Sequence, residues 1–479
     1  MSYSKVFIIF FLFFCFTAFA SSTSLNNNNH KCPKKQRDAL LLFKHTLSSI
    51  NYPIDVCSGP DYHPSDIPLK IPVNLTHLTR LDISHNQLNG TLPSWLFTSP
   101  SLEFLDLSFN MFTGDILLKI PVNLTHLTSL DLSDNNLNGT LPSWLFTSPS
   151  LEYLYLYDNM LSGNVPFESF TSPSLKYLSL TNNQLGGQID VQTFPQLTNL
   201  TSLDLSQNNF SGELELDTLL STLTNLTSLD LSYSGFSVTT NNANHFVNPG
   251  FRYLYLASCK LKVFPNSLRA MKRLRYLDLS SNEIHGQIPH WAGEIGGNHL
   301  YYLNLSHNFI TALPQFQWYG LQQLYLQSNL IEGPFPPSIC NMSTLYYLDM
   351  SNNRFGGLIP QCFGNISSSL ATIDMGNNSF QGTIPNVYGD CGSLEGLILK
   401  GNQLEGCIPE GPQFSTFSIS FGGNSGLYGF PLPNREHQSS PQAISCYQPR
   451  PNWLNGIADA EENMILKRRN KRRSVSMGK

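Results

Sequence analysis

The sequence predicts an α/β solenoid with a parallel β-sheet on its concave face, and three observations lead to this fold class. One phrase, leucine-x-x-leucine-x-leucine-x-x-asparagine or a near variant, occurs fourteen times between Leu78 and Asn402. The phrase returns every 21 to 26 residues, a period typical of stacked repeats. Within one copy, Leu105 and Leu107 share one face of a strand, whereas Asp106 points away. A single copy cannot bury its leucines, so the copies must stack into one continuous core.

The first 20 residues predict a secretory signal peptide. The segment 1–5 carries one positive charge, 6–19 is almost wholly apolar, and Ala18-Phe19-Ala20 offers small residues for cleavage. The apolar run is shorter than the roughly 20 residues that a membrane span needs, and no later stretch approaches that length. We therefore expect a secreted, extracellular protein, with an uncleaved signal anchor as the alternative.

Residues 21–76 are predicted to form an N-terminal cap. Cys32 and Cys57 flank the segment 38–44, whose helical character suits it to cover the leucines of the first coil, and their pairing is one candidate disulfide. Cys340 and Cys362 lie 22 residues apart, close to one coil period, and are the strongest candidate pair in an oxidising compartment. The sequence assigns no partner to Cys391, Cys407 and Cys446.

Residues 77–411 are predicted to hold about fourteen repeats. The closing asparagine of each phrase, such as Asn110, should turn inward and satisfy backbone groups that a tight turn would leave buried and unpaired. Ser234 and Cys259 take that place in two coils, so the ladder of asparagines is imperfect there. A second phrase follows, with glycine and often proline, as in 355–360. The combined phrase resembles the plant-specific class of leucine-rich repeat, which implies a short second strand beside the concave one.

Both ends resemble plant receptor-like proteins. The segment 32–44 is similar to their opening, and 411–417 with 423–432 is similar to their closing cap, here placed at 412–433 and followed by a disordered basic tail at 434–479. The resemblance implies a kinase-lacking receptor whose repeats sense a peptide or pathogen molecule and which acts with partner receptor kinases. If the family's membrane anchor is retained in another form, the location would be the outer face of the plasma membrane.

The chain also departs from that family. Its opening lacks the usual cysteine pair, Tyr428 stands where a cysteine is usual, and the coil ending at Pro409 runs directly into the closing cap without the family's island and further coils. The sequence therefore reads as a shortened relative. The alternatives are a secreted inhibitor of a pathogen's wall-degrading enzyme, similar to the polygalacturonase-inhibiting proteins, and a non-functional truncated receptor.

Composition and motifs argue against catalysis. The chain shows no HExxH, no G-x-S-x-G elbow, no phosphate-binding glycine loop and no kinase motif, so we expect no enzyme activity, cofactor or metal. A net charge of −5 over 479 residues does not produce the positive potential that nucleic-acid binding requires. The basic run 467–473 is either a solvated tail or attracts acidic wall polysaccharide or lipid head groups.

Internal duplication points to the concave face as the binding surface. Residues 69–107 and 118–156 are near copies that differ at six positions, and four of these are assigned to outward strand positions. Core positions would resist change in any case, because cavities and overpacking destabilise. The differing pairs are Arg80/Ser129, Ile83/Leu132, His85/Asp134, Gln87/Asn136, Phe104/Tyr153 and Asp106/Tyr155.

The candidate ligand-binding residues are outward Tyr and Arg side chains, the types that dominate binding hot spots. The alternative is that neighbouring strands favour aromatic pairs for sheet stability. The candidates are Tyr153, Tyr155, Tyr177, Arg252, Tyr253, Tyr255, Arg275, Tyr276, Tyr301, Tyr302 and Tyr325. The aspartates that recur with the phrase are interpreted as structural: Asp82, Asp131, Asp204, Asp230, Asp278 and Asp349.

Eleven asparagines lie in N-x-Ser/Thr sequons and are candidate glycosylation sites. Asn304 and Asn377 are expected within concave strands, where a glycan would obstruct ligand access. The eleven are Asn74, Asn89, Asn123, Asn138, Asn199, Asn209, Asn225, Asn304, Asn341, Asn365 and Asn377.

Overall fold

The structure of the protein is a computed structural model. It describes residues 79–432, apart from short gaps at 93, 98–99, 117–123, 190–193, 195–196, 242–246, 316, 365–369, 391–393, 410–413, 415 and 418–419. The predicted signal peptide, the N-terminal cap with Cys32 and Cys57, the basic tail, the sequons at Asn74, Asn123 and Asn365, and Cys391 and Cys446 lie outside the described residues.

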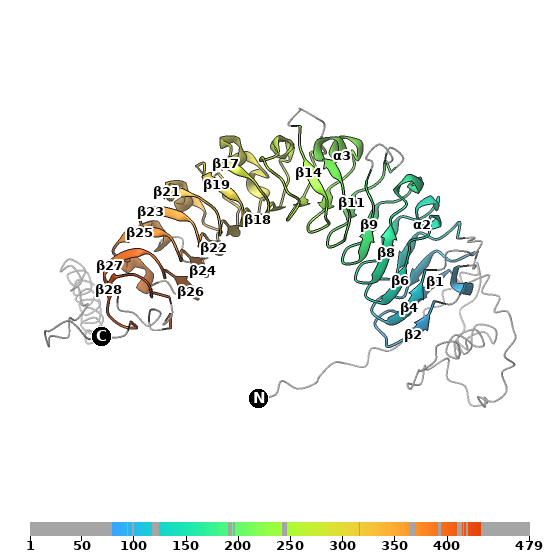
Figure 1. The fold of residues 1–479 in the computed structure, drawn as a ribbon, viewed down its shortest axis with the longest axis horizontal. Coiled ribbons are helices and arrows are strands. Elements are labelled where there is room, and N and C mark those ends of the chain that lie inside the picture. Colours follow the sequence, from blue (N-terminus) through green and yellow to red (C-terminus); the bar gives the residue numbers. More distant parts are fainter. Residues whose placement is uncertain are drawn as a thin grey trace, which may run out of the picture.

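Within the described residues, one long parallel sheet contains fourteen strands, and its strand order follows the chain. The coils form an open arc, with strands such as β18, β22, β24 and β26 along its inner side (Figure 1). The predicted fold class is therefore confirmed. The strands are β1 (Arg80–Asp82), β3 (Phe104–Asp106), β5 (Ser129–Asp131), β7 (Tyr153–Tyr155), β9 (Tyr177–Ser179), β11 (Ser202–Asp204), β13 (Ser228–Asp230), β15 (Tyr253–Tyr255), β16 (Tyr276–Asp278), β18 (Tyr302–Asn304), β20 (Gln323–Tyr325), β22 (Tyr347–Asp349), β24 (Thr372–Asp374) and β26 (Gly396–Ile398).

A second set of strands overlaps the glycine phrase of most coils, as the plant-type resemblance implied. It is divided into short parallel sheets, with strand orders β10-β8-β6-β4-β2, β12-β14, β17-β19 and β21-β23-β25-β27-β28. These strands are β2 (Asn89–Thr91), β4 (Met111–Asp115), β6 (Asn136–Gly139), β8 (Met160–Asn164), β10 (Gln184–Gly186), β12 (Glu213–Glu215), β14 (Ser237–Thr239), β17 (His285–Gln287), β19 (Phe309–Ala312), β21 (Glu332–Pro334), β23 (Arg354–Leu358), β25 (Ser379–Gly382), β27 (Gln403–Cys407) and β28 (Gly426–Tyr428).

Short helical segments complete the convex side of the coils. In the described part of the chain, the α-helices are α2 (Trp144–Thr147) and α3 (Leu216–Thr222). The 3-10 helices are η2 (Ser94–Phe97), η3 (Phe167–Ser169), η5 (Asn266–Ala270), η6 (His290–Glu294), η7 (Gly297–His299), η8 (Pro337–Asn341), η9 (Gln361–Gly364) and η10 (Asn386–Asp390).

A single hydrophobic core runs the length of the stack. The central residue of each concave strand, such as Leu105, Leu277 and Leu348, is fully buried, and the two residues that flank it are not. At the C-terminal end, β28 pairs with β27, and Phe421 and Leu427 join the same core. Burial of this kind contributes roughly 25 cal/mol per Å² of apolar surface, which explains why neighbouring coils hold together.

The asparagine ladder joins each coil to the one before it. The Nδ2 group of Asn110 donates to the carbonyls of Leu107 and Ser108 in its own coil and to Ile83 O in the preceding coil, at 3.0–3.1 Å. Its Oδ1 atom accepts a hydrogen bond from the backbone N–H of Leu88 at 3.0 Å. The predicted inward turn of these asparagines is therefore confirmed.

The ladder weakens where Ser234 and Cys259 replace asparagine. The Ser234 hydroxyl donates to Leu231 O, and the carbonyl of Ser234 accepts the Phe210 N–H at 2.8 Å. The Cys259 thiol is buried and makes sulfur contacts of 3.2 Å to Leu231 O and 3.6 Å to Ala257 O. Neither side chain replaces the full set of amide hydrogen bonds.

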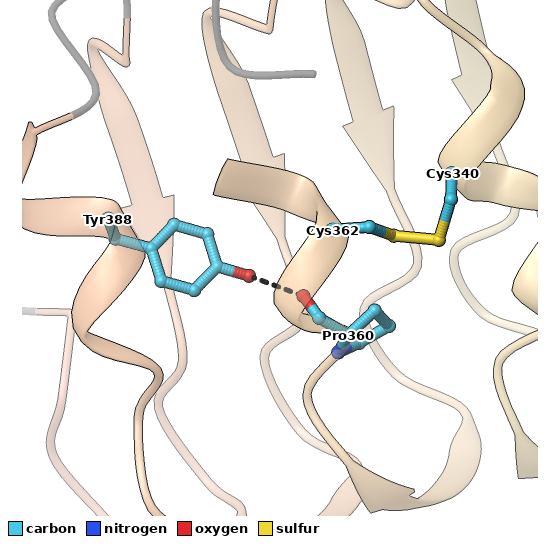
Figure 2. Close-up of a disulfide and its surroundings, with 4 residues drawn as sticks. All are labelled: Cys340, Pro360, Cys362 and Tyr388. Atoms are coloured by element: carbon cyan, nitrogen blue, oxygen red, sulfur yellow. Dashed lines mark hydrogen bonds between the residues drawn. A yellow bond between two sulfur atoms is a disulfide. The ribbon is translucent and has the colours of Figure 1, made fainter. Parts of the chain in front are cut away.

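One disulfide joins neighbouring coils on the convex side. The sulfur atoms of Cys340 in η8 and Cys362 in η9 are 1.97 Å apart, so the pair suggested by the 22-residue spacing is bonded (Figure 2). In the next coil, the Tyr388 hydroxyl donates to Pro360 O at 3.4 Å. Cys407 is disulfide-bonded as well, although the sequence indicated no partner for it.

Two strand assignments from the sequence were wrong, because each concave strand is only three residues long. His85 lies beyond β1 in the turn, with a backbone φ of 54°, so three rather than four of the six differences between the near copies lie at outward strand positions. Asn377 likewise lies in the turn after β24, with φ of 54°. A left-handed residue recurs in nearly every coil at this point of the turn, three residues after the end of the strand.

Candidate recognition surface on the concave sheet

Two rows of side chains point outward from the long sheet. In β16, for example, Leu277 is buried, and its neighbours Tyr276 and Asp278 are half-buried on the outward face. The parallel register places first positions beside first positions and third positions beside third positions along the arc. The repeat therefore aligns one side chain per coil into each row, about 4.8 Å apart.

A continuous series of tyrosine rings crosses five consecutive strands, β15, β16, β18, β20 and β22. The ring centroids of successive members are 5.5, 5.9, 5.4 and 4.9 Å apart. Four of these tyrosines were predicted, and Tyr347 was missed, although it begins its strand phrase just as Tyr276 does. We call this series the tyrosine row: Tyr253, Tyr276, Tyr302, Tyr325 and Tyr347.

The remaining predicted tyrosines form a separate group or stand beside the row. Tyr153 and Tyr177 stack at 5.1 Å on β7 and β9, and Tyr155 makes an edge contact with Tyr157. Ser202 and Ser228 occupy the first positions of the next two strands and separate this group from the tyrosine row. The candidates therefore form two surfaces rather than one.

The ring faces of the tyrosine row are largely occupied by one another. Tyr253, Tyr276 and Tyr302 are stacked with interplanar angles of 26° and 27°. A partner therefore meets ring edges and hydroxyl groups. Burial, followed by the charge of Asp278, raises the pKa of Tyr302, and burial raises those of Tyr325 and Tyr347. These phenols stay protonated near neutral pH. The Tyr325 hydroxyl already donates to Gln323 Oε1 at 3.1 Å, whereas those of Tyr302 and Tyr347 can donate to a partner.

The aspartates at the third position brace the turns that follow the strands. The Oδ1 atom of Asp131 accepts hydrogen bonds from the Ser133 N–H at 3.0 Å and from the Ser133 hydroxyl at 2.6 Å. The same contact to the serine N–H recurs at Asp82, Asp204, Asp230, Asp278 and Asp349. Their structural interpretation is confirmed by these hydrogen bonds.

Asp230 is the most perturbed of these aspartates. Burial, together with the charges of Asp204 and Asp278, raises its pKa to about 7. Asp204 lies directly opposite on the neighbouring strand, where like charges destabilise. In β18, Asn304 fills the same position and accepts the same serine contacts without a charge.

Replacing Asp230 with Asn should stabilise the protein at pH 8 but not at pH 4. The folded-state pKa lies above that of the unfolded chain, so the folded protein holds an extra proton between about pH 4 and 7 and loses that stabilisation as the pH rises. The variant removes the charge and keeps the acceptor for Ser232. Thermal melting of both proteins across this range should show the difference in Tm growing up to about pH 7. A constant difference would contradict the assignment.

Arg252, Arg275 and Tyr301 form a third line, one residue before the strands. The Arg275 N–H donates to Arg252 O, and the Tyr301 N–H donates to Arg275 O, each at 2.8 Å. Arg252 is exposed, and the other two are half-buried. The predicted arginines therefore lie along one edge of the tyrosine row, and Tyr255 lies at a third position on its other side.

The described sequons are mostly accessible. Asn138, Asn199, Asn209, Asn225, Asn341 and Asn377 are exposed, and Asn89 is half-buried. Asn304 differs, because it is half-buried within β18 and both ends of its amide are bonded there: Nδ2 donates to Asp278 Oδ2 at 3.1 Å, and Oδ1 accepts from Ser306. A glycan at Asn304 would break these contacts within the sheet.

The described residues hold neither a metal-binding cluster nor a membrane-spanning helix. These residues contain no group of three or more His, Cys, Asp or Glu side chains placed to hold a metal ion. Within the same part of the chain, no helix has both the length and the apolar character to cross a membrane. A shallow depression near Phe109, Asp134 and Asp158 lies away from the tyrosine row.

Family comparisons agree with this architecture. The family model described as "Leucine rich repeat" matches residues 63–112, 125–185 and 298–355. Related leucine-rich-repeat models match residues 196–213 and 273–294.

Similar proteins include plant receptors. The chain is 34% identical to Receptor-like protein 32 of Arabidopsis thaliana over 137 residues, which is 27% of this chain and 16% of that protein. Across eight such receptor-like proteins, the match spans only 12 to 24% of the relative's length. Among solved structures, the ectodomain of the Arabidopsis receptor kinase HAESA, in complex with an extended IDA peptide hormone, is 28% identical with a TM-score of 0.60, covering 74% of this chain and 62% of that one. HAESA with IDA and the co-receptor SERK1 gives a TM-score of 0.54 at the same identity and coverage.

Proposed function

We propose that this chain, a leucine-rich-repeat protein of the plant receptor-like type, recognises a polypeptide ligand outside the cell through its concave face. The tyrosine row is the observation that carries the proposal. It presents a contiguous surface of ring edges and hydroxyl groups across five strands. Tyrosine is enriched at binding hot spots, because it offers a large rigid contact area with a polar tip.

The surroundings of the row suit recognition rather than catalysis. The aspartates beside the row are held by serine hydrogen bonds, and no described metal cluster accompanies them. Similar repeat ectodomains are described in complex with a peptide hormone, and one of these complexes includes a co-receptor. By analogy, we propose that a partner receptor kinase transmits the signal when the ligand binds to this chain.

The proposed location is the extracellular space. The predicted signal peptide and the many exposed sequons support it, because N-linked glycans are added along the secretory route. The disulfide between Cys340 and Cys362 also fits an oxidising compartment.

Affinity capture tests the proposal. The full chain, expressed with its own N-terminus in plant cells and immobilised, should retain a polypeptide from extracellular fluid. A matched column would carry the Tyr253→Ala, Tyr276→Ala and Tyr302→Ala variant and should retain much less of it. Recovery of the same polypeptide in equal amounts from both columns would exclude the concave face as the binding surface.

A further inference from the structure

One stretch of the solenoid carries a strong local positive charge. Between Asp230 and Asp278 the sequence has no acidic residue, although the protein as a whole has a net charge of −5. Within this stretch seven basic residues fall in little more than one coil: Arg252, Lys260, Lys262, Arg269, Lys272, Arg273 and Arg275.

Four of these basic residues gather at the edge where the concave strands begin. Arg252 and Arg275 directly precede β15 and β16 and are joined through their backbones. Lys272 and Arg273 are exposed in the turn that leads to Arg275. We call these four residues the arginine edge. Lys260 and Lys262 lie beyond the opposite ends of the strands and are also exposed.

Within the described residues, the arginine edge is poorly neutralised. Lys272 pairs with Glu294 at 3.2 Å, with both side chains about half exposed. The other ion pairs of the described residues join Arg80 to Asp82 and Lys176 to Glu152, and both lie on distant coils. Neither Arg252 nor Arg275 has an ion-pair partner in this part of the structure, so both guanidinium groups can meet an external anion.

The opposite side of the tyrosine row is acidic. Asp230 and Asp278 occupy third positions, with Tyr255 between them on the neighbouring strand. A ligand across β15 and β16 therefore meets arginine on one side of the rings and carboxylate on the other. An acidic ligand would be attracted to the arginine edge and repelled by Asp278 at the third position of β16, so it would lie on the arginine side of the rings.

The ring geometry favours a polypeptide over a sugar chain. Sugar rings bind aromatic side chains by lying against the ring faces, but Tyr253, Tyr276 and Tyr302 stack on one another. The exposed edges and hydroxyls instead suit side chains and backbone carbonyls of an extended chain.

We propose that the ligand binds through an acidic segment, rich in Asp or Glu, that runs along the arginine edge beside Tyr253, Tyr276 and Tyr301. The assignment rests on the proposed function, because it names the chemistry of the polypeptide recognised there. Arg252 and Arg275 are the specificity-determining residues, and each guanidinium can hold a carboxylate in a bidentate hydrogen-bonded pair.

The test uses the full secreted chain and a peptide of alternating Glu and Ser. About ten residues suffice, since an extended chain of that length spans about 33 Å and crosses more than five strands. The peptide should bind, and raising the salt from about 50 mM to about 200 mM should weaken binding about tenfold. The Arg252→Glu and Arg275→Glu double variant should lose at least about tenfold in affinity, about 1.4 kcal/mol.

The matched control reverses two charges of the same coil at its opposite edge, Lys260→Glu and Lys262→Glu. This variant has the same net charge as the arginine variant and should stay within about twofold of the parent protein. Equal losses of affinity in both variants would show that the overall charge of the protein, and not the arginine edge, attracts the peptide, and would overturn the proposal. Failure of the peptide to bind, or stronger binding of a Lys-Ser peptide or an oligogalacturonide of equal length, would overturn it too. Polypeptide capture in the previous experiment would then still uphold the proposed function.

Discussion

Replacing Asn282 with alanine should lower the free energy of unfolding by about 3–5 kcal/mol. Its Nδ2 group donates to Leu256 O, Leu279 O and Ser280 O at 2.7–3.0 Å. Its Oδ1 atom accepts from two backbone N–H groups, those of Cys259 and Leu261, at 3.0 and 2.9 Å. Asn110, by comparison, accepts the single N–H of Leu88. Alanine would leave several buried backbone groups unpaired, each costing about 1–3 kcal/mol.

Cys259→Ala is the matched control for Asn282→Ala, because Cys259 fills the same ladder position in the preceding coil. Its thiol makes only weak sulfur contacts, so we expect a loss of about 1 kcal/mol, mostly from reduced packing. Urea unfolding of both variants gives the comparison. Similar losses in the two variants would mean that the amide hydrogen bonds add little to the stability of the stack.

Replacing Tyr253, Tyr276 and Tyr302 together with alanine should reduce affinity for the captured polypeptide at least about a hundredfold. Three adjacent hot-spot side chains would be lost from the centre of the proposed surface. The same variant should lose stability by about 2–4 kcal/mol, because it removes three ring contacts within the sheet. Titration of the polypeptide and thermal melting measure the two effects separately.

The corresponding triple phenylalanine variant separates recognition from sheet packing. Phenylalanine keeps the stacked rings and removes three hydroxyl donors, so the Tm should change little while affinity falls about tenfold or more. If the alanine variant lost stability but kept its affinity, the tyrosines would serve sheet packing alone. That outcome is the alternative that the sequence left open.

The sequence predicted the fold well because the repeat places one chemical requirement at each position. Leu105 and Leu107 must be buried, and Asn110 must form hydrogen bonds with two coils. The residue type at each position of the repeat therefore predicts where its side chain lies. The spacing of Cys340 and Cys362 likewise translated directly into distance, because one coil period separates them. Strand ends were less accurate, since β1 ends at Asp82 and His85, which the pattern assigns to the strand, lies three residues further on in the turn.

The candidate site was less predictable because contacts between rows do not follow the repeat register. Tyr325 lies at a third position, yet its ring contacts Tyr302 and Tyr347 at first positions. That diagonal contact makes the row continuous, and no periodicity in the sequence signals it. The basic stretch between Asp230 and Asp278 was hidden by the negative overall charge of −5. The candidate anion-binding edge becomes visible only in the fold, which places Arg252 beside Arg275.

Photo-crosslinking tests most directly whether the polypeptide lies on the tyrosine row. A photoreactive phenylalanine derivative would replace Tyr276 on the concave face in one protein and Leu358 in another. Leu358 ends β23 of the second set of strands and is 72% exposed, so it is a reactive control on a different surface. Irradiation with the captured polypeptide should cross-link it to position 276 and not to position 358. Cross-linking at position 358 alone would contradict recognition through the concave face.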